Sequence, residues 1–334
     1  MKKTILSMIM ACGAMLGAQA QTVTYHNVTA ETDTANLPTV YFIRDINPEA
    51  LMAVYEATGR KAEGNNVAVK LSTGEAGNPN HVSPDLMKNF LQSVNGTIVE
   101  CNTAYPGKRF DTANHMQTAA EHGFTAIGTV DIMDADGEVG IPVTNGKWLD
   151  EDIVGKNLLG YDFLVSLAHF KGHAMAGFGG AMKNISIGIA SRNGKAYIHS
   201  AGKTKDVQEM WGSFPADSVF QESMAEASEA VINHFGKDKV LFINVANNLS
   251  VDCDCDSRPS KPEILDIGIF ASTDPIAVDQ ACINAVENAP DHGKVHLLDR
   301  IASKDGRHQL EYAESRGLGS RAYRLVELQL PQRR

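Results

Sequence analysis

The side chains with the clearest capacity for chemistry gather in residues 168–184. This segment carries two imidazoles, His169 and His173, and two ammonium groups, Lys171 and Lys183. Imidazole can move a proton or bind a metal ion, and an ammonium group attracts an anion. Glycines in the same segment would let the backbone approach a ligand and turn the N–H groups of a helix start toward it. We therefore predict a site for a small carboxylate or phosphate, with catalytic candidates His173, His169 and Lys171 and cofactor-binding candidates Gly177, Gly179, Gly180, Lys183 and Asn184.

The same segment has a plainer interpretation, which is a tight glycine turn that packs a helix onto a sheet and leaves its histidines on the surface. The glycines alone would favour that interpretation. The gathering of two histidines and two lysines in one span, with His199 downstream, favours the site. The segment is not a P-loop, because the spacing before Lys183 is wrong and no Ser or Thr follows that lysine.

A second reactive group is a Cys-x-Cys pair, Cys253 and Cys255, interleaved with three aspartates. Thiolates bind soft or borderline metal ions, so we predict a metal site with His199 as a further ligand, which His173 or Cys101 could complete. A disulfide, within the pair or to Cys101, is an equal alternative, and a solvated acidic loop is another. Without a metal ion or a nearby cation, an activated cysteine nucleophile is disfavoured, because the carboxylates would raise the thiol pKa values.

Two basic residues of the first half follow predicted strands. Lys70 lies in the strand expected at residues 67–71, and Arg109 follows the strand expected at residues 97–101. The carboxyl ends of strands in open α/β sheets are where ligands bind, and arginine can hold a carboxylate or phosphate through two parallel hydrogen bonds. We predict that both residues contact the anion, although each alone is more often a surface charge.

The first twenty residues have the pattern of a secretory signal peptide. Met1-Lys2-Lys3 is positively charged, residues 5–16 are mostly apolar, and Ala18-Gln19-Ala20 fits a cleavage site. We therefore expect a protein that is exported to the periplasm or the exterior. An alternative is lipidation of Cys12, which ranks lower because Met10 stands where a lipobox prefers a small residue.

Charge and hydropathy limit the partners of the chain. It has 30 Lys and Arg residues against 40 Asp and Glu residues, a formal net charge of -10. Sequence-independent binding to nucleic acid or to an anionic membrane needs clustered positive charge, and the excess of acidic residues argues against such binding. No segment after the signal peptide is apolar enough for a stable membrane span. The expected partner is a small anionic ligand.

Strand and helix signals alternate along the chain, which indicates an α/β fold with a mainly parallel sheet covered by helices. We predict two lobes, an N-terminal one over residues 21–150 and a C-terminal one over residues 151–334 that carries both reactive segments. A ligand crevice is expected at the carboxyl ends of the strands. The predicted strands are residues 39–43, 67–71, 97–101, 129–133, 161–167, 240–245 and 267–270, and the main helices are residues 48–58, 84–94, 112–122 and 218–234 and one opened by Pro275.

Several motifs resemble the family catalogued as domain of unknown function 362, whose members often carry the label uncharacterised iron–sulfur centre protein. The resemblance covers nearly the whole mature chain, and its most specific part is the run His169–Asn184. Many relatives carry a ferredoxin-type four-cysteine segment shortly after the position of His199, but residues 201–232 of this chain contain no cysteine. An iron–sulfur cluster is therefore not expected here. The other matching segments include Lys70 with Gly74-Glu75, Asn102–Arg109, Cys253-Asp254-Cys255 and Ser272–Ala281.

A shorter stretch is similar to the active-site segment of the nickel-pincer-nucleotide lactate racemase family. It comprises His173, Lys183 and His199, with the glycine turn inside it. The resemblance implies that His173 acts in proton or hydride chemistry, that Lys183 holds the cofactor and that His199 ligates nickel. A cofactor of the nickel-pincer type is thus one that the resemblance implies.

Two functions of different classes follow. The first is an exported metal-dependent enzyme that acts on a small anionic substrate by acid/base chemistry, of the racemase or epimerase kind or another. The second is a non-catalytic protein of the same fold that binds a metal ion or a ligand. A third possibility is a structural paralogue whose site is vestigial. The first two require the glycine-rich segment to fold against Cys253 and Cys255.

Overall fold

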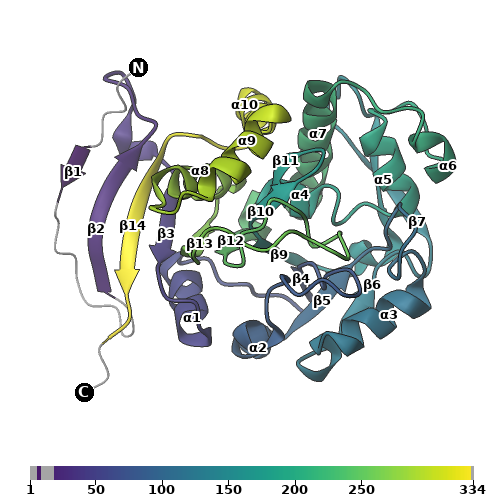
Figure 1. Ribbon diagram of the computed structural model, residues 1–334, viewed down its shortest axis with the longest axis horizontal. Helices are drawn as coiled ribbons and strands as arrows, with labels where there is room; N and C mark the ends of the chain where they lie inside the picture. Colours follow the sequence, from purple (N-terminus) through teal and green to yellow (C-terminus); the bar gives the residue numbers. More distant parts are fainter. Residues whose placement is uncertain (1–5, 9–18, 332–334) are drawn as a thin grey trace.

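The computed structural model describes residues 6–8 and 19–331, and its main feature is one ten-stranded sheet (Figure 1). Five neighbouring strands, β12, β9, β4, β5 and β6, run parallel to one another, whereas β13 is antiparallel to both its neighbours. The α/β class and the mainly parallel sheet are thereby confirmed. The strands in sheet order are β1 (Leu6–Met8), β2 (Gln19–His26), β14 (Tyr323–Gln329), β3 (Thr39–Ile43), β13 (Gly268–Ser272), β12 (Val240–Ala246), β9 (Phe163–His169), β4 (Val67–Lys70), β5 (Gly96–Glu100) and β6 (Val130–Ile132).

Strands from both predicted lobes belong to this sheet. β4 lies in the N-terminal segment and β9 in the C-terminal segment, and the two strands pair directly. Residues 21–150 and 151–334 therefore share one sheet, and the boundary at residue 150 stays a prediction. Two small antiparallel pairs lie outside the sheet, β7 (Glu138–Pro142) with β8 (Glu151–Gly155) and β10 (Lys171–His173) with β11 (Gly177–Gly179).

Helices cover both faces of the sheet, because successive side chains of a strand point to opposite sides. In β9, Val165 and Leu167 pack in the apolar cluster that contains α1 and α2, whereas Leu164 packs in the cluster that contains α7 and α8. Figure 1 shows these two helix layers below and above the sheet. The helices are α1 (Pro48–Ala57), α2 (Pro84–Ser93), α3 (Thr112–Glu121), α4 (Ala181–Ile185), α5 (Arg192–His199), α6 (Val207–Met210), α7 (Asp217–Phe235), α8 (Pro275–Asn288), α9 (Lys294–Ser303) and α10 (His308–Ser315).

The helix starts agree with the capping signals. Asn47 accepts a hydrogen bond from the N–H of Ala50 at the start of α1, and Asp274 accepts from two N–H groups at the start of α8. Such caps satisfy donors that the helix itself leaves unpaired. Among the described helices, none combines the length and the apolarity needed to cross a membrane. Most of the signal-peptide segment, including Cys12, lies outside the described residues, so cleavage and lipidation stay predictions.

The connections of the parallel strands fix where a ligand site can form. After β4 the chain continues to β5 and β6 on one side, whereas β9 is followed by β12 on the other side. Strand order thus reverses between β4 and β9, and in open α/β sheets a crevice forms at such a point, outside the carboxyl ends of the strands.

The start of α4 is capped by a carboxylate from a distant helix. Asp279 of α8 accepts hydrogen bonds from the N–H groups of Ala181 and Met182 at 2.7 and 3.0 Å and from the Asn244 amide at 2.7 Å. A Cβ atom on Gly180 would lie 2.3 Å from an Asp279 oxygen, so this position needs glycine. The expectation that the N–H groups of this helix start face a ligand is therefore wrong, because Asp279 occupies them.

We predict that Asp279→Ala lowers the free energy of unfolding by roughly 2–4 kcal/mol, because it leaves three buried donors unpaired. Urea unfolding at neutral pH measures the change. The control is Asp238→Ala, since Asp238 is fully exposed and only ion-paired with Arg60 at 3.5 Å. That control is expected to shift the free energy by less than about 0.5 kcal/mol. Equal effects of the two substitutions would contradict the assignment of Asp279 as a buried cap.

Candidate functional site

A cavity of about 600 Å³ lies at the point where the strand order reverses. Its wall includes Lys70 at the end of β4, Cys101 directly after β5 and Ala168 near the end of β9. The rest of the wall includes parts of the loops after β4 and β5 (residues 72–76 and 103–109), of the β10–β11 hairpin with α4, and of residues 187–188 and 252–257. Lys195, His199, Met210, Trp211 and Phe214 complete it. The two reactive segments of the sequence therefore meet in one cavity.

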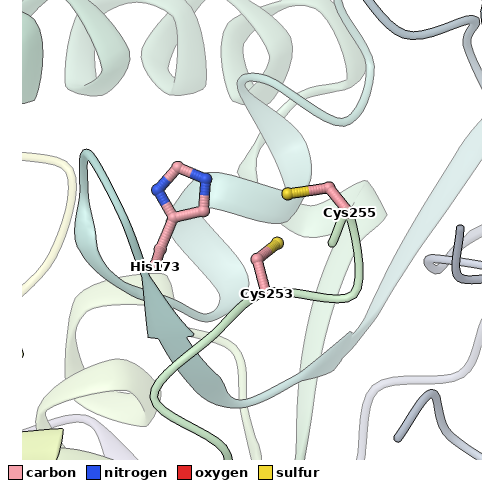
Figure 2. A group of neighbouring side chains, drawn as sticks. All are labelled: His173, Cys253 and Cys255. Atoms are coloured by element: carbon pink, nitrogen blue, oxygen red, sulfur yellow. The ribbon is translucent and has the colours of Figure 1, made fainter. Parts of the chain in front are cut away.

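Three potential metal ligands come together in this wall. The ligand atoms of His173, Cys253 and Cys255 all lie within 4.8 Å of one another. His173 is on β10, and the two cysteines are on the long connection between β12 and β13. Figure 2 shows one edge of the His173 imidazole ring facing the sulfur atoms of Cys253 and Cys255. The four described cysteines, which also include Cys101 and Cys282, are free thiols.

Asp254 fixes the direction of the two cysteine side chains. Its carboxylate accepts hydrogen bonds from His169 Nδ1 at 2.7 Å and from Lys171 Nζ at 2.6 Å, and only 2% of the residue is exposed. Burial alone would raise the pKa of this carboxyl, but His169 and Lys171 hold it far below its usual range. The Asp254 side chain is thus held inside the protein, while Cys253 and Cys255 on either side line the cavity.

Close backbone contacts bring the cysteine loop to the hairpin. The N–H of Gly172 donates to Ser250 O at 2.8 Å, and the N–H of Glu75 donates to Asp254 O at 2.7 Å. A Cβ atom on Gly172 would lie 2.2 Å from Val251 O, so only glycine lets the loop cross β10 at this distance. Hydrogen bonds therefore hold the loop to β10 and to the segment that follows β4.

The hydrogen bonds of His173 orient its ring. Nδ1 accepts from the N–H groups of Met175 and Ala176 at 3.2 and 2.9 Å, so in the neutral ring the proton resides on Nε2. Burial, followed by the charge of Lys183, lowers the pKa of His173 well below its usual value, which keeps the ring neutral. A metal ion at Nε2 would have to displace that proton, and metal binding generally releases protons from its ligands.

The thiol pair lies in a positive environment. The pKa of Cys253 is lowered well below its usual value, mainly by a hydrogen bond from Cys255. Burial alone would raise this pKa, but the charges of Lys183 and Lys171 lower it further. The same interaction, together with burial, raises the pKa of Cys255. The cations therefore outweigh the carboxylates that the sequence places beside these thiols.

Most of the predicted anion contacts are already paired. Lys171 is bound to Asp254, and Arg109 lies between Glu100 at 3.3 Å and Glu75 at 3.5 Å. Lys70 Nζ donates to Leu71 O and to Asn184 Oδ1 at 2.5 and 3.3 Å. Lys183 lines the cavity and is half-buried, and its side-chain ammonium makes no hydrogen bond or ion pair with the described residues. Lys183 is therefore the predicted cation that remains available for an anion.

Glu100 is the centre of a buried network beside the cavity. It accepts hydrogen bonds from Thr73 Oγ1 at 2.5 Å and His115 Nε2 at 2.8 Å, and its ion pair with Arg109 is nearby. Burial alone would raise the pKa of Glu100, but Arg109, His115 and Lys70 lower it far below its usual range. The charge of Arg109 is neutralised here, so its guanidinium is not free to clamp an anion.

Several predicted site residues have other surroundings than expected. Both ring nitrogens of His169 face oxygen acceptors, Asp254 and Asn247 O, and His169 is not part of the cavity wall. Gly177 packs against the backbone near Ile301, whereas Gly179 lies in the wall beside the stems of Lys171 and Lys183.

The predicted ligand His199 lies in the wall but outside the group of three. Its Nδ1 is 2.6 Å from Lys195 O, and its ring stacks on Phe220. Burial lowers the pKa of His199 to about 4, so the ring is neutral. Asn184 also lines the wall, but its amide donates to Lys70 O and to Ser166 Oγ. Cys101 donates its S–H to Ile189 O and is not in the group either.

Other residues that shape the site carry weak signals in the sequence. Glu100 is a charge at the end of an apolar strand, which is the kind of position where a functional carboxylate occurs. Gly172, Asp279 and His115 have no distinctive spacing, because their roles depend on partners far along the chain. Trp211 and Phe214, which line the mouth of the cavity, also escape a motif-based analysis.

Comparison with known proteins agrees with the family resemblance. A family model described as domain of unknown function (DUF362) matches residues 67–284, more than half of the chain. No curated protein matches the sequence.

Two solved structures are similar at low identity. The lactate racemase apoprotein from Thermoanaerobacterium thermosaccharolyticum is 15% identical, with a TM-score of 0.39 over 69% of this chain and 55% of that one. A protein from Thermotoga maritima is 12% identical, with a TM-score of 0.42 over 72% of this chain and 58% of that one. The chain thus spans little more than half of either protein, and neither likeness assigns a role to a residue here.

We predict that Glu100→Gln lowers the free energy of unfolding at pH 7 by about 3–5 kcal/mol, because it leaves buried cations unpaired. The folded-state pKa of Glu100 is depressed, so its contribution is present above the unfolded value of about 4.3 and is lost as the pH falls below it. The difference in the free energy of unfolding between wild type and Glu100→Gln should therefore narrow by about 2 kcal/mol between pH 7 and pH 3. Urea unfolding across that range measures it. The exposed Glu56→Gln is the control, and a gap for Glu100→Gln that stays constant in acid would contradict the pairing.

Proposed function

Since the chain belongs to the family described as a domain of unknown function (DUF362), which names no activity, we propose its function from the cavity. The protein binds a metal ion through Cys253, Cys255 and His173, and with that ion it acts as an enzyme on a small anion held by Lys183. The observation that carries this proposal is the approach of three ligand atoms to within 4.8 Å of one another in the wall of a cavity.

The donor set indicates the class of metal ion. Two thiolates and one imidazole suit zinc and other soft or borderline ions rather than magnesium or calcium. Three protein ligands with a side open to a cavity are typical of catalytic metal sites, whereas structural zinc sites use four protein ligands. When bound, such an ion supplies a Lewis acid for an oxygen atom of the substrate.

The side chains around the metal group supply binding and proton transfer. Lys183 has no partner of its own among the described residues and would hold the anion beside the metal. Burial lowers the pKa of Lys70 to about 8, so this amine at the end of β4 can exchange a proton near neutral pH. In this proposal His169 and Lys171 position Asp254 and the cysteine loop rather than contact the substrate.

The residues fit a simple metal ion and not the set that the lactate racemase resemblance implies. That set assigns the metal to His199, whose ligand atoms are not in the group of three and whose Nδ1 is directed to Lys195 O. The residues present therefore do not fit a nickel-pincer cofactor with His199 as the metal ligand.

We also propose export, which rests on the signal-peptide pattern of residues 1–20. Metal binding would then protect Cys253 and Cys255 from oxidation outside the cytoplasm. Amino-terminal sequencing of protein isolated from its source cells tests the cleavage after Ala20, and a start at Met1 would contradict it.

Metal binding is expected to distinguish the two histidines. In a titration of the reduced full chain with Cd²⁺ or Zn²⁺, followed by calorimetry and by thiolate-to-metal absorption, wild type should bind one ion. Cys253→Ser, Cys255→Ser and His173→Ala should each weaken binding by about a hundredfold, at least the loss known for outer-sphere partners. His199→Ala is the matched control and should retain wild-type affinity.

Two results would contradict the metal site. One is an equal loss in His199→Ala and His173→Ala, which would return the site to the set expected from the sequence. The other is a wild-type chain that binds no ion after full reduction, or that carries a Cys253–Cys255 disulfide when isolated without metal.

Anion binding is expected to depend on Lys183. Calorimetric titration with inorganic phosphate and with acetate should show at least about tenfold weaker binding to Lys183→Gln, because a charge-assisted contact is lost. Lys203→Gln is the control, since Lys203 is exposed and outside the cavity wall. Metal affinity should stay within about threefold of wild type in Lys203→Gln. Unchanged anion affinity in Lys183→Gln would refute its role.

A further inference from the structure

We infer that the anion this cavity accepts carries an apolar, planar group, and that this group packs on Trp211 and Phe214 at the cavity mouth. The inference rests on the proposed function for its anion end, which Lys183 would hold. It adds the chemical class of the rest of the ligand and names two residues that determine specificity.

The size of the cavity argues against a bare small anion. At a share of about 30 Å³ for each water, a volume of about 600 Å³ corresponds to roughly 20 water molecules. Acetate or phosphate has only a few heavy atoms and would displace a small part of that water. A cavity of this size fits a larger organic molecule that would be mostly buried inside it.

The apolar end of the cavity is defined by two exposed aromatic side chains. Trp211 is 55% exposed and Phe214 is 37% exposed, and both belong to the cavity wall. Only five large hydrophobic side chains of the described residues are this exposed, and two of them stand at this mouth. Exposed apolar groups that cluster at a cavity are typical of ligand contacts.

The aromatic rings continue from the mouth into the protein. Trp211 and Phe214 meet edge to face at 5.8 Å, Phe214 lies 6.5 Å from the ring of His199, and His199 stacks on Phe220 at 4.9 Å. His199 is neutral, as its lowered pKa indicates, so it adds an uncharged ring face rather than a cation. The row therefore offers a planar ligand edge-to-face and stacked contacts.

The positive charge of Lys183 orients the ligand, because the aromatic side chains of the wall are apolar. Lys183 is half-buried and its charge acts on His173 and Cys253 of the metal group, whereas Trp211 is 55% exposed. An apolar neutral molecule would leave the ammonium of Lys183 unpaired and partly desolvated, which costs free energy. An anion with an aromatic or similarly planar tail satisfies both ends at once.

The test compares three probes by calorimetry on the full-length chain: acetate, 3-phenylpropionate and the uncharged 3-phenylpropionamide. We expect 3-phenylpropionate to bind at least about tenfold more tightly than either of the others. Trp211→Ala and Phe214→Ala should each remove most of the advantage over acetate and leave acetate affinity unchanged. Trp211→Phe should keep it, because an aromatic face remains. Leu265→Ser, at an exposed residue outside the cavity wall, is the control and should change nothing.

The outcomes separate this inference from the proposed function. Equal affinity of wild type for acetate and 3-phenylpropionate overturns the inference, as does a loss in Trp211→Ala that is the same for both anions. Lys183→Gln should weaken both anions by the same factor and leave the amide unaffected. If wild type binds no metal ion but still prefers 3-phenylpropionate, the metal site fails and the inference stands. If neither anion binds, the anion site and the inference fail together.

Discussion

The site depends on one buried interaction, the contact of the Asp254 carboxylate with His169 and Lys171. A carboxylate that is 2% exposed is stable only when cations or hydrogen-bond donors surround it, and these two side chains provide both. Asp254 is the middle residue of the Cys-x-Cys sequence. With its side chain held inside, Asp254 anchors the turn whose two cysteines line the cavity, so a structural ion pair fixes the segment that carries the reactive thiols.

A second constraint is the pairing of charge around the cavity. Lys171 is paired with Asp254, and Arg109 with Glu75 and Glu100. Of the cations predicted to contact an anion, Lys183 is therefore the one whose ammonium group has no partner among the described residues. A charge that is neutralised by a buried partner contributes little to ligand binding, because the ligand would have to compete with that partner. The chemistry of the cavity therefore depends less on how many basic residues line it than on which of them is unpaired.

The sequence predicts the elements well and the site in part. Asn47, Pro84 and Asp274 mark helix starts that the structure retains, because caps are local signals. The meeting of the two reactive segments also follows from their places after β9 and β12. What spacing alone cannot reveal is pairing over distance: Lys171 and Asp254 are 83 residues apart, and Ala181 and Asp279 are 98 apart. The same holds for the ligand set, because the fold-back of β10 onto β11 brings His173 rather than His199 to the thiols.

The assembly of the metal group from separate segments has a consequence for its energetics. His173 and the two cysteines are joined by no short stretch of chain, so the unfolded protein holds no preformed site. Their approach relies on the passage of the loop over Gly172, where a single methyl group would collide with the backbone of Val251. Free energy gained when a metal ion binds there would therefore also stabilise the folded chain, since binding to the native state alone shifts the folding equilibrium toward it. Folding and ligand binding at this cavity are thus coupled through the same loop contacts that set the direction of Asp254.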